Sequence, residues 1–341
     1  MDPSVHDRGP VTRGPAGAAP PRRPGSVRRT TTIDMRWVDG WGSALVLEGR
    51  GRDLRTASDG SSRALAESTM RVDVAPDRVI TRIDTEPWLV GTVELLGTRA
   101  SGGFRTRLSE ALEARGVPGS SDPVQLLLDD VPGATLISGF AFAQWHPIEE
   151  LLDAGRSEGA VRRPMTGICT GFQAGSRGLA PDGTSRWTHR TREVEPLEAT
   201  HDVLAWRELQ QISALSMRRA RRIDVWVEGS EGRVDAMFQD SSTRSQGGRV
   251  AVHEYTLDAR ADLATMTLTA VEPTPHVLPY AECPLAVLNV GTLVGTPLAE
   301  LRVVVLERLQ GVAGCTHLND ALRALADVPA LLGQLAGSVE Q

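Results

Sequence analysis

The chain has 341 residues, of which 40% are apolar and 23% are charged, and its formal net charge is −6. This length accommodates about two domains of ordinary size, and the composition is that of a folded protein. The acidic balance argues against nucleic acid as a partner. No apolar run reaches the roughly 20 residues of a membrane-spanning helix, and no secretory signal is recognisable at the N-terminus. We therefore expect a cytoplasmic protein with no membrane partner.

All 37 basic residues are arginine, because the sequence contains no lysine. Schiff-base catalysis and the attachment of pyridoxal phosphate need a lysine amine, and so does the phosphate-binding loop of P-loop nucleotidases. We therefore expect neither pyridoxal phosphate nor a P-loop nucleotide site. The three cysteines, Cys169, Cys283 and Cys315, are too few and too scattered for a disulfide framework. In a reducing cytoplasm they should be buried, reactive or metal-bound thiols.

The first ordered elements follow a tail rich in proline, glycine and arginine. Residues 1–26 have the composition of a flexible segment. Beyond them, β-branched stretches at 44–47, 70–74 and 78–83 predict an antiparallel meander. The spacing of apolar residues over 104–115 predicts a helix.

Short motifs of the first part of the chain recur in the same order about 190 positions later. Arg28–Met35 matches Arg218–Val225 without a gap, and Asp130–Pro132 matches Asp327–Pro329. Small changes in offset between such matches are what loop insertions produce. The sequence therefore predicts a tandem duplication of one α+β module.

We expect each repeat to form a small antiparallel sheet with helices on one face. The predicted organisation is a disordered tail over 1–26, a first α+β repeat over 27–139, a linker or insert over 140–213, and a second α+β repeat over 214–341. The two repeats are expected to pack against each other.

The strongest local motif is Gly314–Leu318, which reads Gly-Cys-Thr-His-Leu and precedes a helical pattern. Cys315 would lie just before a helix N-terminus, where the partial positive charge lowers the pKa of a thiol. His317 is near enough to bind the same ion or to accept the thiol proton. Cys315 and His317 are therefore the candidate catalytic residues. Alternatively, Cys315 is a buried apolar residue and His317 caps a turn.

A second cysteine occupies a comparable place. Cys283 precedes Pro284, which suits the first position of a helix. Cys283, Cys315 and His317 make a three-ligand set suited to zinc or an iron–sulfur cluster, with Cys169 as a further candidate. The repeat alignment places Ser120 where the second repeat has Cys315, so a thiol-dependent site can exist only in the second repeat.

Other candidates carry weaker signals. His253 is followed by glutamate but lacks the continuation of an HExxH motif. His189 and His201 are predicted to be polar groups at the surface. The arginines of 218–222 could bind a phosphate or carboxylate, but a solvated start of a strand is the favoured interpretation.

The residues above resemble a family of unknown function, DUF2889. The resemblance depends most on Gly314–Leu318, with further matches at Cys283-Pro284 and at Arg221–Asp224. It extends over most of 27–331 and implies no established activity.

A more distant resemblance is to the scaffold proteins of iron–sulfur cluster assembly (NifU/SufE type). The order of strands, Cys283, the segment Gly295–Glu300 and a final cysteine is similar, which implies a ligand role for Cys283 and Cys315. His317 follows the last cysteine instead of preceding it. The first cysteine of the pattern is absent unless Cys169 replaces it.

These observations leave three functional hypotheses. The first is a metal- or sulfur-handling protein with Cys283, Cys315 and His317 as ligands and Cys169 as a possible fourth. The second is an enzyme acting on a small organic molecule, with Cys315 as nucleophile or metal ligand and His317 as base or ligand. The third is a non-catalytic binding or assembly module with structural cysteines. The sequence leaves the substrate, the metal and the oligomeric state open.

Overall fold

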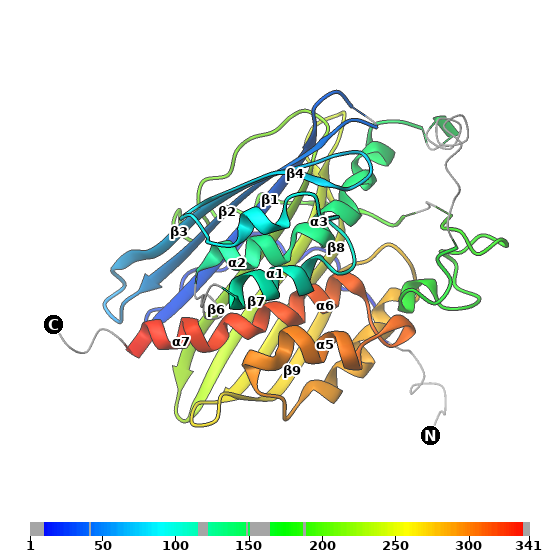
Figure 1. Cartoon of the computed structure of the whole chain (residues 1–341). Helices are drawn as coiled ribbons and strands as arrows, with labels where there is room; N and C mark the ends of the chain where they lie inside the picture. The colour runs from blue at the N-terminus through cyan, green and yellow to red at the C-terminus, as the bar shows by residue number, and fades with distance from the viewer. Residues whose placement is uncertain are drawn as a thin grey trace, which may run out of the picture.

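A single antiparallel sheet of nine strands runs through the molecule (Figure 1). The computed structural model describes residues 10–40, 42–114, 122–147, 149–150, 164–186 and 189–336. The strands are β1 (Ser26–Trp37), β2 (Leu45–Thr56), β3 (Ser62–Val74), β4 (Ile80–Glu86), β5 (Arg192–Val194), β6 (Met217–Glu228), β7 (Glu231–Thr243), β8 (Arg249–Asp262) and β9 (Thr267–Val277). The order is β4-β3-β2-β1-β6-β7-β8-β5, and β9 also pairs with β8.

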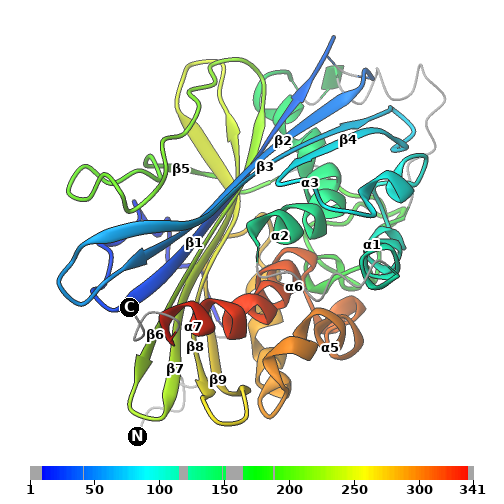
Figure 2. The same ribbon diagram turned by 60° about the vertical axis from the view of Figure 1, so that its left-hand side comes forward.

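Short helices follow each group of four long strands, and Figure 2 shows them gathered on one side of the sheet. The first group is η2 (Thr92–Leu95), α1 (Phe104–Glu113), α2 (Pro123–Asp129), α3 (Val131–Ile137) and η3 (Ser138–Gln144). The isolated turn η4 is Thr170–Phe172. The second group is η5 (Cys283–Leu293), η6 (Leu298–Glu300), α5 (Leu301–Arg308), η7 (Gly311–Ala313), α6 (Thr316–Arg323), η8 (Ala324–Asp327) and α7 (Val328–Ala336).

The α+β class is confirmed, but the expectation of two separate small sheets is wrong. β1 pairs with β6 in antiparallel register from Ser26 opposite Trp226 to Met35 opposite Met217, which joins both halves of the chain into one sheet. Strand β1 is buried along almost its whole length, as an internal strand must be.

Charge complementarity specifies the register of this junction. Arg28 lies opposite Asp224, and Asp34 lies opposite Arg218. Arg28 Nη2 donates to Asp224 at 2.9 Å, and Arg218 Nε donates to Asp34 at 2.6 Å. A shift by one residue would turn these side chains to the other face and leave buried charges without partners.

The apolar core lies between the sheet and the helices and continues across the junction. One cluster unites the first helices with Ile33 of β1 and includes Met217 of β6. The other unites the second helices with Ile223 of β6 and includes Val27 of β1. Each half therefore contributes to the core of the other, so the halves bury apolar surface jointly.

The arginines of β6 are buried, which corrects the prediction of a solvated strand start. Arg218, Arg219, Arg221 and Arg222 are each at most 5% exposed, and all of them pair with aspartates. Buried charges persist only where opposite charges and hydrogen bonds compensate them. Side chains alternate between the two faces of a strand, so Arg219 and Arg221 point toward the helices. Arg218 and Arg222 point toward the opposite face.

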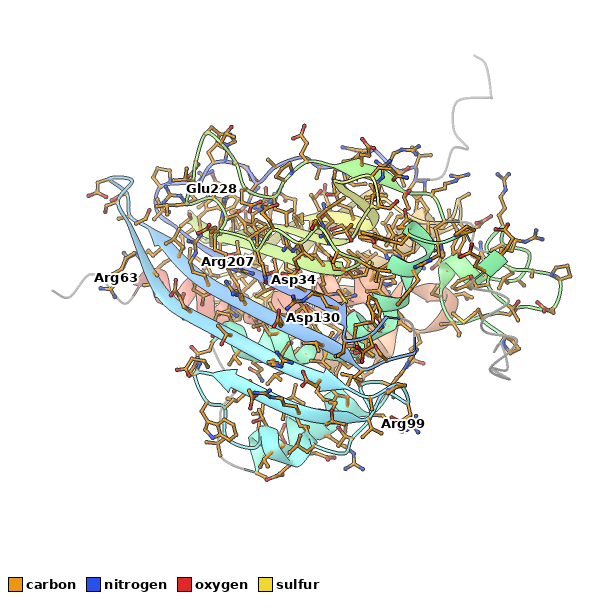
Figure 3. All side chains as sticks on the ribbon, turned by 90° about the horizontal axis from the view of Figure 1, so that it is seen from above. Asp34, Arg63, Arg99, Asp130, Arg207 and Glu228 are labelled. Carbon is orange, nitrogen blue, oxygen red and sulfur yellow. The ribbon has the colours of Figure 1, made fainter. Side chains whose placement is uncertain are left out.

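On the helix side, two bidentate pairs occupy matching places in the two halves. Arg29 donates to both oxygens of Asp53 at 2.7 and 2.6 Å, and Arg219 to both oxygens of Asp240 at 2.9 and 3.0 Å. Each arginine also reaches a helix of the other half. Arg29 donates to Asp327 at 2.7 Å. Arg219 donates to Asp130, one of the interior residues labelled in Figure 3, at 3.3 Å.

Further pairs extend these contacts into one buried network. Among the described residues it consists of six arginines and six aspartates: Arg29, Arg105, Arg219, Arg221, Arg302, Arg323, Asp53, Asp129, Asp130, Asp240, Asp320 and Asp327. The network therefore carries no net charge when all its members are ionised. It connects the inner face of the sheet with α1, α2, α5, α6 and η8.

The opposite face of the sheet is covered by the segment predicted as a flexible tail and by the later part of the predicted linker, at residues 197–209. The earlier part of that linker lies on the helix side, where Phe140 joins the core and Thr170 contacts Gly314. From residue 10 onward the tail is held in place: the Arg13 N–H donates to the Pro275 carbonyl of β9 at 3.0 Å, and Arg22 pairs with Asp202 of the predicted linker. Residues 1–9 lie outside the described residues. From the linker, Trp206 packs into a small apolar cluster of its own.

In the part of the chain that the structure describes, no single helix is long and apolar enough to cross a membrane. Together, the pair Pro123–Asp129 and Val131–Gln144, bent by 45°, meets the requirement of length and composition.

Replacing Arg29 by methionine should lower the free energy of unfolding by about 3–5 kcal/mol, because it leaves Asp53 and Asp327 buried without their shared cation. The matched control is Arg63→Met, on an exposed part of β3 (Figure 3), which should change stability by less than about 0.5 kcal/mol. Urea unfolding followed by circular dichroism measures both. Equal effects of the two substitutions would contradict a structural role for the network.

Candidate functional site

Three buried side chains converge where β7, β8 and α6 meet. Asp240 on β7 lies opposite His253 on β8 in the register of the sheet, and His317 approaches from the first turn of α6. Asp240 Oδ2 is 3.8 Å from His253 Nδ1 and 3.8 Å from His317 Nε2. In the described residues these three form a group whose potential ligand atoms all lie within 4.8 Å of one another.

Both imidazoles are held as neutral rings. Burial, assisted by the nearby Arg219, lowers the pKa of His317 to about 3. Burial, with His317 as the next cause, puts the pKa of His253 well below its usual range. The two rings stack with centroids 3.4 Å apart, an arrangement that repulsion would oppose if both were charged. Neutral imidazole is the form that binds metal ions.

The ring nitrogens that face Asp240 have no other partner. His253 Nδ1 and His317 Nε2 are buried and make no hydrogen bond. A buried polar atom left unpaired costs free energy, so its presence calls for an explanation such as an ion. On the far side of its ring, His317 Nδ1 is 3.4 Å from the Thr316 hydroxyl.

Arg219 orients the carboxylate of this group. Its two hydrogen bonds fix the plane of Asp240, while burial raises the pKa of that carboxyl and Arg219 acts against the rise. Each carboxylate oxygen has two lone-pair positions, so Oδ2 can accept from Arg219 and still face the imidazoles.

The spacing fits a small transition-metal ion. A tetrahedral zinc ion with bonds of about 2.1 Å separates its ligand atoms by about 3.4 Å. The two separations of 3.8 Å require only a few tenths of an ångström of closure. The two rings are stacked 14° from parallel, so at least one of them must turn out of the stack before both nitrogen lone pairs point at one ion. Two imidazoles and one carboxylate leave at least one coordination position open, as catalytic zinc sites do.

The predicted cysteines gather beside this group rather than in it. Cys315 is the N-cap of α6 and Cys283 begins η5 with a proline behind it, as expected from the sequence. The linker brings Cys169 to them, because the Thr170 N–H donates to the Gly314 carbonyl at 2.9 Å. Close packing here leaves no room for a side chain at Gly171, where a β-carbon would lie 2.6 Å from Cys283 Sγ.

The expectation of an activated thiolate at Cys315 is corrected by its burial. Cys315 is 4% exposed, and burial raises the pKa of its thiol although the backbone N–H groups of Leu318 and His317 act in the opposite direction. Burial also raises the pKa of Cys283 well above its usual value and that of Cys169 to about 11. All three thiols are therefore protonated near neutral pH.

The proposed pairing of Cys315 with His317 is not how these side chains lie. His317 faces Asp240 and His253, and the thiol of Cys315 faces Tyr255. The predicted ligand set of Cys169, Cys283, Cys315 and His317 does not form a group with ligand atoms within 4.8 Å of one another among the described residues.

Sequence reasoning missed Asp240 and undervalued His253. Asp240 and His253 lie opposite each other on neighbouring strands. The sequence alone does not give the register of β7 and β8, so it could not place these two residues together. The same register in the first half pairs Asp53 with Ala66, so that half has no counterpart of His253. Ser120, the expected counterpart of Cys315, lies outside the described residues.

The other two histidines considered above differ in placement. His189 is half-buried, and its ring centroid lies 5.1 Å from that of Phe140 and 5.6 Å from that of Tyr280, so it is not the exposed polar group that was predicted. His201 is exposed, as predicted.

Comparison with known families gives a match within the second half of the chain. Residues 217–331 match the family described as a protein of unknown function, DUF2889. The matched range contains Asp240, His253 and His317. Comparison with curated proteins and with solved structures found no match, so the resemblance to iron–sulfur scaffold proteins has no support from them.

Buried, protonated thiols should alkylate slowly. At pH 7.5 we expect Cys283 and Cys315 to react with iodoacetamide at least tenfold more slowly than free cysteine, with half-buried Cys169 modified first. Mass spectrometry of peptides after timed quenching gives the order. A Cys315 that reacts faster than free cysteine would contradict the protonated, buried state.

Proposed function

We propose that this protein binds one divalent transition-metal ion, zinc or ferrous iron, through Asp240, His253 and His317. The observation that carries the proposal is the pair of buried imidazole nitrogens that face one carboxylate and have no hydrogen-bond partner. A divalent ion would satisfy all three groups at once. The metal-handling hypothesis is thus retained with a different set of ligands.

The donor set favours a single ion over an iron–sulfur cluster. Clusters are held mainly by cysteine thiolates, whereas burial keeps Cys169, Cys283 and Cys315 protonated. Imidazole with carboxylate suits zinc or non-haem iron. We assign the three thiols a role in packing around the site, and sulfur handling is a weaker alternative.

An enzymatic role is the second candidate, because an ion with these three protein ligands would keep a coordination position open. A metal held by three protein ligands can polarise a carbonyl or phosphoryl oxygen, or lower the pKa of bound water. Under this alternative His317 acts as a ligand, and Cys315 is not the nucleophile, because it is buried and faces Tyr255. Under this alternative the substrate is a small organic molecule, as in the second hypothesis from the sequence.

We also propose that the two halves arose by tandem duplication. The support is the agreement between the sequence repeat and the contacts: Arg29 and Arg219 are repeat equivalents, and so are Asp327 and Asp130. Each arginine binds the aspartate supplied by the opposite half. Under this proposal, Ala66 occupies the place in the first half that corresponds to His253 in the second half. The first half therefore has no such site and serves as a structural partner.

Elemental analysis tests the metal proposal. Protein purified without chelator, or reloaded with Zn²⁺ or Co²⁺ and desalted, should hold about one ion per chain. His253→Gln and His317→Gln should each weaken binding at least a hundredfold, because each removes one of three ligands. Co²⁺ titration followed by visible absorbance measures the affinity.

Two variants serve as controls for that titration. His201→Gln, at an exposed histidine, and Cys315→Ser should bind Co²⁺ as the unsubstituted chain does. Circular dichroism establishes that every variant folds. Loss of the ion in Cys315→Ser with retention in both histidine variants would overturn the proposed ligand set and restore the cysteine site.

A further inference from the structure

We propose that the outer face of the sheet, opposite the helices, binds a phosphate group through Arg50, Arg52 and Arg207. Strand β2 carries the first two arginines, and the predicted linker supplies the third. Asp53 of the same strand faces the helices, so Arg50 and Arg52 face away from them. The candidate metal site lies on the helix side, and phosphate binding on the outer face does not depend on a metal.

Charge balance distinguishes this face from the helix side, where six arginines match six aspartates. On the outer face around β1, Asp34, Asp202 and Asp224 each already pair with a different arginine. Among the described residues, the three arginines of the proposed site form no ion pair. Those that donate hydrogen bonds reach only carbonyl and hydroxyl oxygens. Cations withdrawn from water without a counter-charge are costly, so an external anion is favoured.

Arg52 is the most buried of the three arginines, at 8% exposure. Its Nη2 donates to the Leu204 carbonyl at 2.8 Å, and its Nε is buried with no hydrogen-bond partner. Nη1 has no partner either, but it keeps contact with solvent. Burial lowers the pKa of this arginine. Unpaired N–H groups of a buried cation cost free energy, which an acceptor entering from solvent would relieve.

Arg207 lies over β1 beside Asp34, as Figure 3 shows. Its Nη2 donates to the Thr32 hydroxyl and to the Arg50 carbonyl, which places the guanidinium next to strand β2. Its Nε is buried without a partner. Burial lowers the pKa of Arg207 to about 10, and the charges of Arg50 and Arg52 act in the same direction against that of Asp34. The three arginines therefore lie close enough to share one anion.

An open cavity of about 560 Å³ adjoins these arginines on the outer face. Arg50, Thr69 and Gln210 line it, so the exposed Arg50 side chain connects the buried arginines with solvent. Farther along, the cavity is lined by Asp84 and Glu86 of β4. Carboxylates accept hydrogen bonds from hydroxyl groups. The cavity therefore favours the phosphate ester of a small polyol over free phosphate.

Two acids of the neighbouring strands lie near the arginines without pairing with them. Glu48 binds Arg36 and Arg71 instead. Glu67 lies opposite Arg52 in the register of β2 and β3, but it is exposed and forms no ion pair among the described residues. Glu67 is therefore the one acid of this surface that could compete with an external anion for Arg52.

The chemistry of arginine favours phosphate over carboxylate at this site. A guanidinium presents its N–H groups as a planar fork that binds two oxygens of one anion. Three such groups offer more donors than the two oxygens of a carboxylate can use. A phosphate ester has three terminal oxygens and carries nearly two negative charges at neutral pH. It therefore matches both the donors and the charge.

Isothermal titration calorimetry of the full chain tests the proposal, with glycerol phosphate, inorganic phosphate, acetate and glycerol as probes. We expect one glycerol phosphate to bind saturably per chain, acetate to bind at least tenfold more weakly, and glycerol not to bind. Glycerol phosphate binding more tightly than inorganic phosphate supports the ester as ligand. Equal affinities would overturn the ester and leave free phosphate as the ligand of the same arginines.

Substitutions locate the binding on the outer face. Arg50→Gln and Arg207→Gln should each weaken glycerol phosphate binding about tenfold or more, because each removes hydrogen bonds between ions. Arg63→Gln, at an exposed arginine of β3 labelled in Figure 3, is the matched control and should leave binding unchanged. Glu67→Gln should bind at least as tightly as the unsubstituted chain. Circular dichroism establishes that each variant folds.

Four results would overturn the proposal. The first is that neither phosphate probe binds, and the second is that Arg50→Gln and Arg207→Gln bind as tightly as Arg63→Gln. The third is binding that appears only in Glu67→Gln, because Glu67 would then be the anion that the arginines already hold. The fourth is acetate binding as tightly as glycerol phosphate, which would make this a carboxylate site.

Discussion

Arg29 and Arg219 each donate hydrogen bonds to an aspartate on a neighbouring strand. Each also donates to a second aspartate in the helical segment of the opposite half. Because these arginines are buried, the strands that carry them can pair only in a register that places Asp53 opposite Arg29 and Asp240 opposite Arg219. The same contacts place the helices over the sheet. The continuous sheet, the shared apolar core and the position of the candidate site therefore all depend on this exchange of charges between the halves.

The candidate site lies at one end of the network. Asp240 is its terminal acid, and its second oxygen faces two neutral imidazoles where the first half has no histidine. The Arg219–Asp240 pair thus has two roles: it stabilises the sheet and fixes the plane of a carboxylate that can bind an ion. A metal here would be coupled electrostatically to helices that do not touch it, among them α1, whose Arg105 shares Asp320 with Arg219.

The sequence was informative where local chemistry decides the structure. The start of α6 at the Cys315 motif and the start of η5 at Cys283 follow from capping residues and spacing. It was misleading where pairing between distant strands decides. Nothing local distinguishes a solvated arginine from Arg219 bound to Asp240, and no spacing rule brings Asp240 to His253. Burial likewise raises the pKa of the Cys315 thiol, where the sequence predicted a lowered pKa. Desolvation of the thiolate outweighs its stabilisation at the helix N-terminus.

The central claim is that a metal ion binds to nitrogen and oxygen ligands of β7, β8 and α6. X-ray absorption spectroscopy of the zinc-loaded chain tests it most directly, because the first coordination shell distinguishes light donors from sulfur. We expect nitrogen and oxygen scatterers at about 2.0–2.1 Å, with the outer-shell pattern of two imidazoles and no sulfur. Sulfur scatterers at about 2.3 Å would contradict it and assign the metal to the cysteines.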